Sequence, residues 1–217
     1  MRNQITTLQD ALEMRFFAPL RRPRTRRVGV ELEFPIWNRT PGAPTDFAAV
    51  HAATDNRSRT WTLVHNGTIF NGAHLNDYMG VQHGDTDSER VLLYLVDQIN
   101  VAQNHRCRAL DEAERFDVLF GAIAELAQGN KLNLLFHDGE VLYAHCNFRD
   151  ALHVWRDTDG VAFSTRPLSM GTWTPVPFTS LVAVKNGEIV RTSPPHGNEY
   201  VYNPEDYRLV YMNFARL

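Results

Sequence analysis

The spacing of apolar residues predicts two helices in the middle of the chain. Thr86 is the expected N-cap of the first helix, and Glu89 stands three residues later, where it can complete a capping box. Gly129 is the expected stop after the second helix. The apolar face of the first helix comprises Val91, Leu92, Leu95, Val96 and Ile99, and that of the second comprises Phe116, Leu119, Phe120, Ile123 and Leu126.

Three hairpins are predicted after the second helix, because segments with strand-like patterns flank strong turn residues. The turns are Asp138-Gly139, the loop ending at Gly160, and Asn186-Gly187. The paired segments are 131–137 with 140–146, 152–156 with 161–165, and 178–184 with 188–191. Two helices followed by a run of hairpins predict an α+β layered fold.

The chain before residue 55 has less regular sequence patterns. Residues 5–17 pattern as a short amphipathic helix, residues 21–27 hold five arginines, and residues 27–37 alternate like a strand. A further strand is expected at residues 61–65. These patterns divide the chain into an N-terminal appendage, residues 1–54, and one domain, residues 55–217.

Composition excludes several functional classes. The net charge is −3, which gives no general attraction to nucleic acid or to an anionic membrane, and no apolar run approaches the ~20 residues of a membrane span. We expect the arginine-rich stretch to be a solvated linker. Cys107 and Cys146 lack metal-ligand spacing, and two free or buried thiols predict a cytoplasmic protein.

Candidate chemistry first appears where the strand at residues 61–65 ends in His65-Asn66-Gly67. Hydrolysis of a carboxamide needs hydrogen-bond donors aimed at the developing oxyanion. An Asn side chain and the N–H of the following Gly can supply two such donors. Asn-Gly is also a common tight-turn dipeptide, so on its own this pair indicates either an oxyanion site or a turn.

The second candidate is Asp87, in the first turn of the helix capped by Thr86. The helix dipole and the free N–H groups there favour an ionised carboxylate. Such a group could receive the ammonium of a free amino acid. The plain alternative is an ordinary acidic residue of a first helical turn.

Together, the segments 61–71 and 84–90 resemble class II glutamine amidotransferases, which are N-terminal-nucleophile hydrolases. Segments 130–135, 175–179 and 196–200 extend the resemblance over roughly residues 55–217. It implies a layered αββα sandwich of antiparallel sheets, here truncated at its N-terminus. It also implies glutamine or a γ-glutamyl amide as substrate, a possible ligase or synthetase partner, and neither a metal nor another cofactor.

The resemblance also assigns roles to individual residues. Asn66 and Gly67 would form the oxyanion hole, and Asp87 would hold the amino group of glutamine. His65 would belong to the substrate-binding set.

One expected group has no counterpart, because the family's nucleophile is a cysteine at the first position and this chain starts with Met1. Cys107 and Cys146 cannot present a free amine beside the sulfur, and Thr6, Thr7 or Ser58 would need a processing cleavage. We therefore expect impaired catalysis. A non-catalytic binding module and a recombined fragment without function remain alternatives.

Residues 27–54 resemble the start of bacterial glutamate–cysteine ligases, in which glutamates of a similar strand bind magnesium. Glu31 and Glu33 share a strand face, as joint metal ligation requires, but a plain strand explains the pattern too. We expect residues 28–37 to dock at a sheet edge with both glutamates toward solvent. Deleting residues 1–26 should then preserve solubility, whereas deleting residues 1–40 should not.

Overall fold

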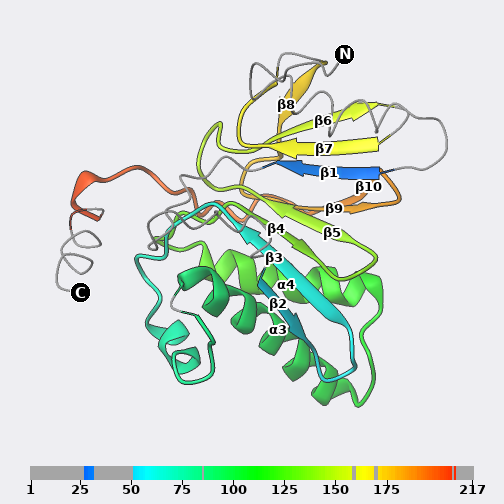
Figure 1. The fold of residues 1–217 in the computed structure, drawn as a ribbon, viewed down its shortest axis with the longest axis vertical. Helices are drawn as coiled ribbons and strands as arrows, with labels where there is room; N and C mark the ends of the chain where they lie inside the picture. The colour runs from blue at the N-terminus through cyan, green and yellow to red at the C-terminus, as the bar shows by residue number, and fades with distance from the viewer. Residues whose placement is uncertain are drawn as a thin grey trace, which may run out of the picture.

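Two β-sheets lie face to face, and two helices cover the outer face of the larger sheet (Figure 1). The computed structural model describes residues 27–31, 51–84, 86–157, 160–168, 171–206 and 208. The α+β prediction is confirmed. Of the four layers expected, three are among the described residues, because both long helices lie on one side. The elements are β1 (Arg27–Glu31), β2 (His51–Thr54), β3 (Thr60–His65), η2 (Ala73–Tyr78), α3 (Asp87–Arg106), α4 (Glu112–Leu126), β4 (Leu134–His137), β5 (Leu142–His145), β6 (His153–Asp157), β7 (Gly160–Ser164), β8 (Trp173–Pro175), β9 (Leu181–Lys185) and β10 (Glu188–Thr192).

The six-stranded sheet has the order β10-β9-β5-β4-β3-β2, and all its pairs are antiparallel. Its β4–β5 and β9–β10 hairpins are two of those predicted, and β6–β7 is the third. Strand β3 pairs with β2 on one side and with β4 on the other, where Thr62 lies opposite His137 and His65 opposite Leu134. The strand that carries the candidate site is therefore held on both sides.

The four-stranded sheet has the order β1-β7-β6-β8. Its edge strand β1 pairs with β7 in parallel, from Arg27 opposite Gly160 to Glu31 opposite Ser164, whereas the other pairs are antiparallel. A parallel pair needs a long connection, which the distance between β1 and β7 along the chain provides. Docking of this strand at a sheet edge is confirmed for residues 27–31, and residues 32–37 lie outside the described part.

Two apolar clusters join the layers. The first lies between the helices and the six-stranded sheet, where the ring of Trp61 stacks on that of Phe136 with centroids 4.8 Å apart. The second lies between the two sheets and includes Leu135, Ala144 and Phe163. Successive residues of β4 alternate between the clusters, as the pleat of a strand requires.

The helix boundaries follow local capping chemistry. Thr86 caps α3 as predicted, since its hydroxyl accepts a hydrogen bond from the Glu89 N–H at 3.2 Å. Asp111 and Glu114 form a complete capping box at the start of α4, which the sequence reading had missed. Gly129, with a φ of 73°, lies just beyond the end of α4. The helix predicted at residues 5–17 lies outside the described residues.

Candidate functional site

The candidate site begins where β3 ends. Pairing with the neighbouring chain continues past the strand: Asn66 N donates to Asn133 O at 2.8 Å, and Thr68 N to Lys131 O at 2.9 Å. Gly67 lies between these two bonds. A Cβ at position 67 would stand 2.0 Å from Lys131 O and 2.3 Å from His65 Nε2, so only glycine fits this backbone.

The N-terminal end of α3 meets this segment directly. Asp87 Oδ2 accepts a hydrogen bond from the Ile69 N–H at 3.0 Å, and His65 Nδ1 lies 3.1 Å from Ser88 Oγ. The structure thus brings the two sequence motifs into contact. His65 faces the helix layer and is 9% exposed, so its ring supports the junction from behind.

Two hydrogen-bond donors at this junction are available to a ligand. Within the described residues, neither the Asn66 side-chain amide nor the Gly67 N–H has a hydrogen-bond partner. Asn66 is only partly buried. Asn66 and Gly67 thus carry two neighbouring donors, on the same segment whose Ile69 N–H donates to the Asp87 carboxylate.

Lys131 is a charged residue of this region that the sequence reading did not single out. Its backbone pairs with Thr68, and its ammonium lies 4.9 Å from the ring centroid of Phe148. Burial lowers the pKa of Lys131, and no described carboxylate forms an ion pair with it. The available signal was that Lys131 is one of only two lysines in the chain.

The segment 196–200 lies across the same end of the sheet. The ring of Tyr200 stacks on that of Phe70 with centroids 5.4 Å apart, and Tyr200 N donates to Asn147 O at 2.8 Å. Phe70 follows the His-Asn-Gly motif by three residues. The segment therefore packs against the loop that carries the candidate donors.

Two histidines tie this segment to β5. His145 Nδ1 lies 2.7 Å from Leu132 O, which fixes Nδ1 as a donor and leaves Nε2 as an acceptor in the neutral ring. His196 Nε2, 2.9 Å from His145 Nε2, must then be the donor, and His196 Nδ1 accepts from Asn198 N at 3.0 Å. The hydrogen bonds thus assign one tautomer to each ring.

This pair requires both rings to be neutral. Burial and the neighbouring His196 lower the pKa of His145 to about 3, and burial lowers the pKa of His196. A proton added to His145 Nε2 would face the N–H of His196. The pair is therefore a structural contact at neutral pH, and its protonation in acid should destabilise the fold.

Neither cysteine is arranged as a nucleophile. Cys146 is 2% exposed, its thiol donates to Phe148 O at 3.0 Å, and burial raises its pKa to about 11. Cys107 is exposed at the C-terminal end of α3, whereas the site lies at the N-terminal end of this 20-residue helix. A helix of that length spans about 30 Å.

Ser58 is the one hydroxyl candidate among the described residues. Ser58 lies inside the β2–β3 hairpin, with a φ of 66° and its N–H donated to Asp55 O. Thr6 and Thr7 lie outside the described residues.

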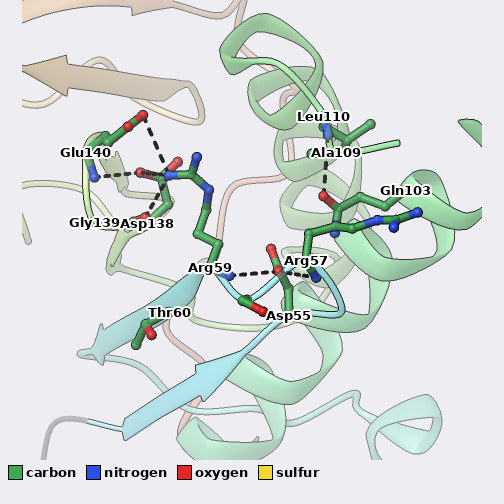
Figure 2. Close-up of a pocket in the computed structure, with 11 residues that line it drawn as sticks. Asp55, Arg57, Arg59, Thr60, Gln103, Ala109, Leu110, Asp138, Gly139 and Glu140 are labelled. Atoms are coloured by element: carbon green, nitrogen blue, oxygen red, sulfur yellow. Dashed lines mark hydrogen bonds and ion pairs between the residues drawn. The ribbon is translucent and has the colours of Figure 1, made fainter. Parts of the chain in front are cut away.

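A cavity of about 380 Å³ lies at the opposite end of β3, beside Thr60 (Figure 2). Its charged groups already have partners: Arg59 lies 3.6 Å from the carboxylates of Asp138 and Glu140, and Asp55 accepts from two backbone N–H groups. Asn66, Gly67 and Asp87 do not line it. The cavity is therefore separate from the site that the motifs define.

The prediction that Glu31 and Glu33 of the ligase-like strand could bind a metal stays a prediction. Glu31 is the last residue of β1, but its side chain is outside the described part, as is all of Glu33. Among the described residues, no three histidines, cysteines or carboxylates gather as a metal site. No helix of the described part is both long and apolar enough to cross a membrane.

Known proteins resemble the part of the chain that contains both motifs. The family model described as "Glutamine amidotransferases class-II" matches residues 40–158, more than half of the chain. A provisionally assigned glutamine amidotransferase of Haemophilus influenzae is 26% identical over 155 residues, which cover 60% of this chain and 51% of that protein. An uncharacterized protein of Methanocaldococcus jannaschii is 27% identical, over 59% of this chain and 42% of that protein. The chain thus spans about half the length of these curated relatives.

Two solved structures are similar to part of this chain. A predicted glutamine amidotransferase from Pseudomonas aeruginosa has a TM-score of 0.47 and 21% identity, over 61% of this chain and 60% of that one. The glutamine phosphoribosylpyrophosphate amidotransferase from B. subtilis, solved with ADP and GMP, has a TM-score of 0.47 and 11% identity. That match covers 65% of this chain and 30% of the other.

Proposed function

Since this chain belongs to the class II glutamine amidotransferases, we propose that it binds glutamine or a γ-glutamyl amide where β3 ends. The family match confirms the resemblance drawn from the two motifs. The binding groups are the Asn66 amide, the Gly67 N–H and the Asp87 carboxylate, with His65 supporting the junction through Ser88.

One observation carries the proposal: two unengaged donors lie beside an acidic helix terminus. Asn66 and Gly67 present donors without a partner in the described residues, and Asp87 is linked to the same loop through Ile69 N. The amide oxygen of glutamine would accept from the two donors. Its ammonium would lie on the Asp87 carboxylate at the start of α3.

We further propose that the 217-residue polypeptide binds this ligand without hydrolysing it. The support is the state of its two cysteines, since a cysteine attacks as the thiolate and not as the thiol. The Cys146 thiol is buried and has a pKa raised to about 11, and Cys107 lies at the far end of α3. An oxyanion site without a nucleophile retains only a small part of an enzyme's acceleration.

Calorimetric titration with L-glutamine tests the binding. Asp87→Asn keeps an oxygen that can accept from Ile69 N but removes the charge, so affinity should fall at least tenfold. Asp97→Asn is the matched control, because Asp97 is an exposed acid on the same helix that contacts only Tyr78 OH in the described part. Equal affinities of both variants and the unmodified chain would refute the assigned role of Asp87.

Ammonia release from millimolar glutamine at neutral pH tests the absence of turnover. We expect background rates and no stoichiometric labelling of Cys107 or Cys146 by a cysteine-directed glutamine analogue. Sustained release that Asn66→Ala abolishes would contradict this part and would reveal another nucleophile.

The resemblance also suggests a ligase or synthetase partner that would use the bound amide. The matched region is only part of the curated relatives, which leaves room for such an activity elsewhere. Co-purification of the chain with an ATP-dependent ligase would support this.

A further inference from the structure

Three buried asparagines lie behind the candidate donors. Asn130 and Asn147 have no exposed surface, and Asn133 is 2% exposed. A buried amide is costly unless its oxygen and nitrogen are both hydrogen-bonded. Each of these three side chains meets that condition through bonds to backbone groups.

Asn133 holds both backbone groups of Asn66. Its carbonyl accepts from Asn66 N at 2.8 Å, and its side-chain Nδ2 donates to Asn66 O at 3.0 Å. Its Oδ1 accepts from Asn147 N at 3.2 Å and from Phe148 N at 3.3 Å. These partners fix which side-chain atom is oxygen and which is nitrogen, and they hold the amide from the opposite side.

The bond to Asn66 O has a consequence for Gly67. Asn66 O and the Gly67 N–H belong to one planar peptide group and point in opposite directions across it. Fixing the oxygen therefore fixes the direction of the N–H. Glycine at position 67 would otherwise let this peptide rotate, because glycine tolerates many backbone conformations.

Asn130 secures the other end of the same loop. Its Oδ1 accepts from Phe70 N and Asn71 N, both at 2.7 Å, and its Nδ2 donates to Asn71 O at 2.8 Å. Asn147 connects Asn130 with Asn133, since its Nδ2 donates to Asn130 O at 2.8 Å and its N–H to Asn133 Oδ1. The peptide between Asn66 and Gly67 is thus built into a continuous hydrogen-bond network.

We propose that Asn133 is a positioning residue that orients the Asn66–Gly67 peptide so that the Gly67 N–H points at the substrate oxygen. Asn133 touches no substrate itself. This inference rests on the proposed function for the assignment of Gly67 as an oxyanion donor, but the orientation of the peptide is a property of the chain alone.

The residual dipolar coupling of the Gly67 N–H in ¹⁵N-labelled protein measures that orientation without any ligand. Asn133→Asp keeps the oxygen that faces Asn147 and replaces the donor with an acceptor against Asn66 O. We expect the Gly67 coupling to change while couplings along α4 stay the same, and affinity for L-glutamine to fall at least tenfold. Asn133→Ser, whose side chain is too short to reach Asn66 O, should act in the same direction if the acid variant does not fold.

Gln103→Glu is the matched control. Gln103 is also 2% exposed, and its amide nitrogen donates to a carbonyl oxygen, Asn56 Oδ1, toward the other end of β3. This variant should leave the Gly67 coupling unchanged and the affinity within twofold.

Separate outcomes decide the two proposals. An unchanged Gly67 coupling in the Asn133 variants would overturn the positioning role, as would a coupling in the unmodified chain that shows averaging over two peptide orientations. If the unmodified chain shows the expected coupling but binds no glutamine, the proposed function fails and the positioning role of Asn133 stands.

Discussion

At the residue scale, Gly67 is constrained by space and not only by conformation. An added methyl group would overlap Lys131 O at 2.0 Å, and that atom is backbone and cannot swing away. We predict that Gly67→Ala shifts the loop and lowers the free energy of unfolding by between about 1 and 3 kcal/mol. Urea unfolding measures this. Gly80→Ala is the control, since nothing lies within 4 Å of its added Cβ, and it should be nearly neutral.

The His145–His196 pair makes a prediction about pH. Both pKa values are lowered in the folded chain, that of His145 to about 3, so below pH ~6.5 the unfolded chain binds protons that the folded chain does not. The contribution of this pair to the free energy of unfolding is therefore fully present above the unfolded pKa and is lost as pH falls toward 3. For His145 alone the loss between pH 8 and pH 5 should be roughly 2 kcal/mol, as urea unfolding across that range would show.

Two variants separate this pair from other acid effects. His145→Gln removes the titrating ring and should flatten the dependence between pH 8 and pH 5, even if it lowers stability overall. His105→Gln, an exposed position at the end of α3, should keep the dependence of the unmodified chain. The assignment is wrong if both variants lose stability in acid as steeply as the unmodified chain does.

Single residues show which parts of the site the sequence could predict. The motifs that contain Asn66, Gly67 and Asp87 could be recognised, because their residue types and spacing lie within short segments, and the binding roles of these residues stay predictions. Asn133 and Asn147 could not be recognised, because their side chains bond to backbone groups of segments distant in sequence. Nothing local distinguishes a buried asparagine from one in an exposed turn.

At the scale of elements, the β4–β5 hairpin is fixed to α4 by a buried ion pair. Asp138 was predicted only as a turn residue, but its carboxylate accepts from Arg115 Nε at 2.8 Å and from Tyr143 OH at 3.1 Å, with no exposed side-chain surface. Burial opposes its ionisation, yet the N–H groups of Val141 and Glu140 and the charge of Arg115 lower the pKa of Asp138. The turn thus serves as an anchor between layers.

We predict that Asp138→Asn destabilises the chain by about 3 kcal/mol, because it removes the buried counter-charge of the Arg115 guanidinium and leaves only the exposed Glu140 carboxylate, 3.8 Å away. Asp117→Asn is the control on the same helix. Asp117 pairs with Arg191 at the surface, where a lost ion pair costs under about 1 kcal/mol. Urea unfolding of both variants at neutral pH would contradict the prediction if their losses were equal.

Elements with local determinants were predicted well. The three hairpins depend on turn residues such as Asn186-Gly187, and the two helices on capping and periodicity within one segment. Strand β8 was missed, because its three residues become a strand only by pairing with β6. The parallel partner of β1 was likewise beyond prediction, since β7 lies more than a hundred residues further along the chain.

At the scale of the molecule, the appendage expected before residue 55 contributes strands to both sheets. β1 adds to the edge of the four-stranded sheet and β2 to the edge of the six-stranded sheet. The family match begins at residue 40, so β2 lies within it and β1 does not. The region matched by the family model therefore supplies an edge strand to the six-stranded sheet, whereas the edge strand β1 of the four-stranded sheet comes from outside that region.

The position of β1 permits a sharper truncation test than the one expected from sequence. A chain that starts at residue 27 keeps β1, whereas one that starts at residue 32 uncovers β7, whose Val161 and Phe163 are buried. An exposed apolar edge strand pairs readily with other chains. We predict that the first truncation stays in solution and that the second forms aggregates, as size-exclusion chromatography with light scattering would show. If both truncations elute as the same species, β1 does not protect this edge, and the four-stranded sheet is stable with three strands.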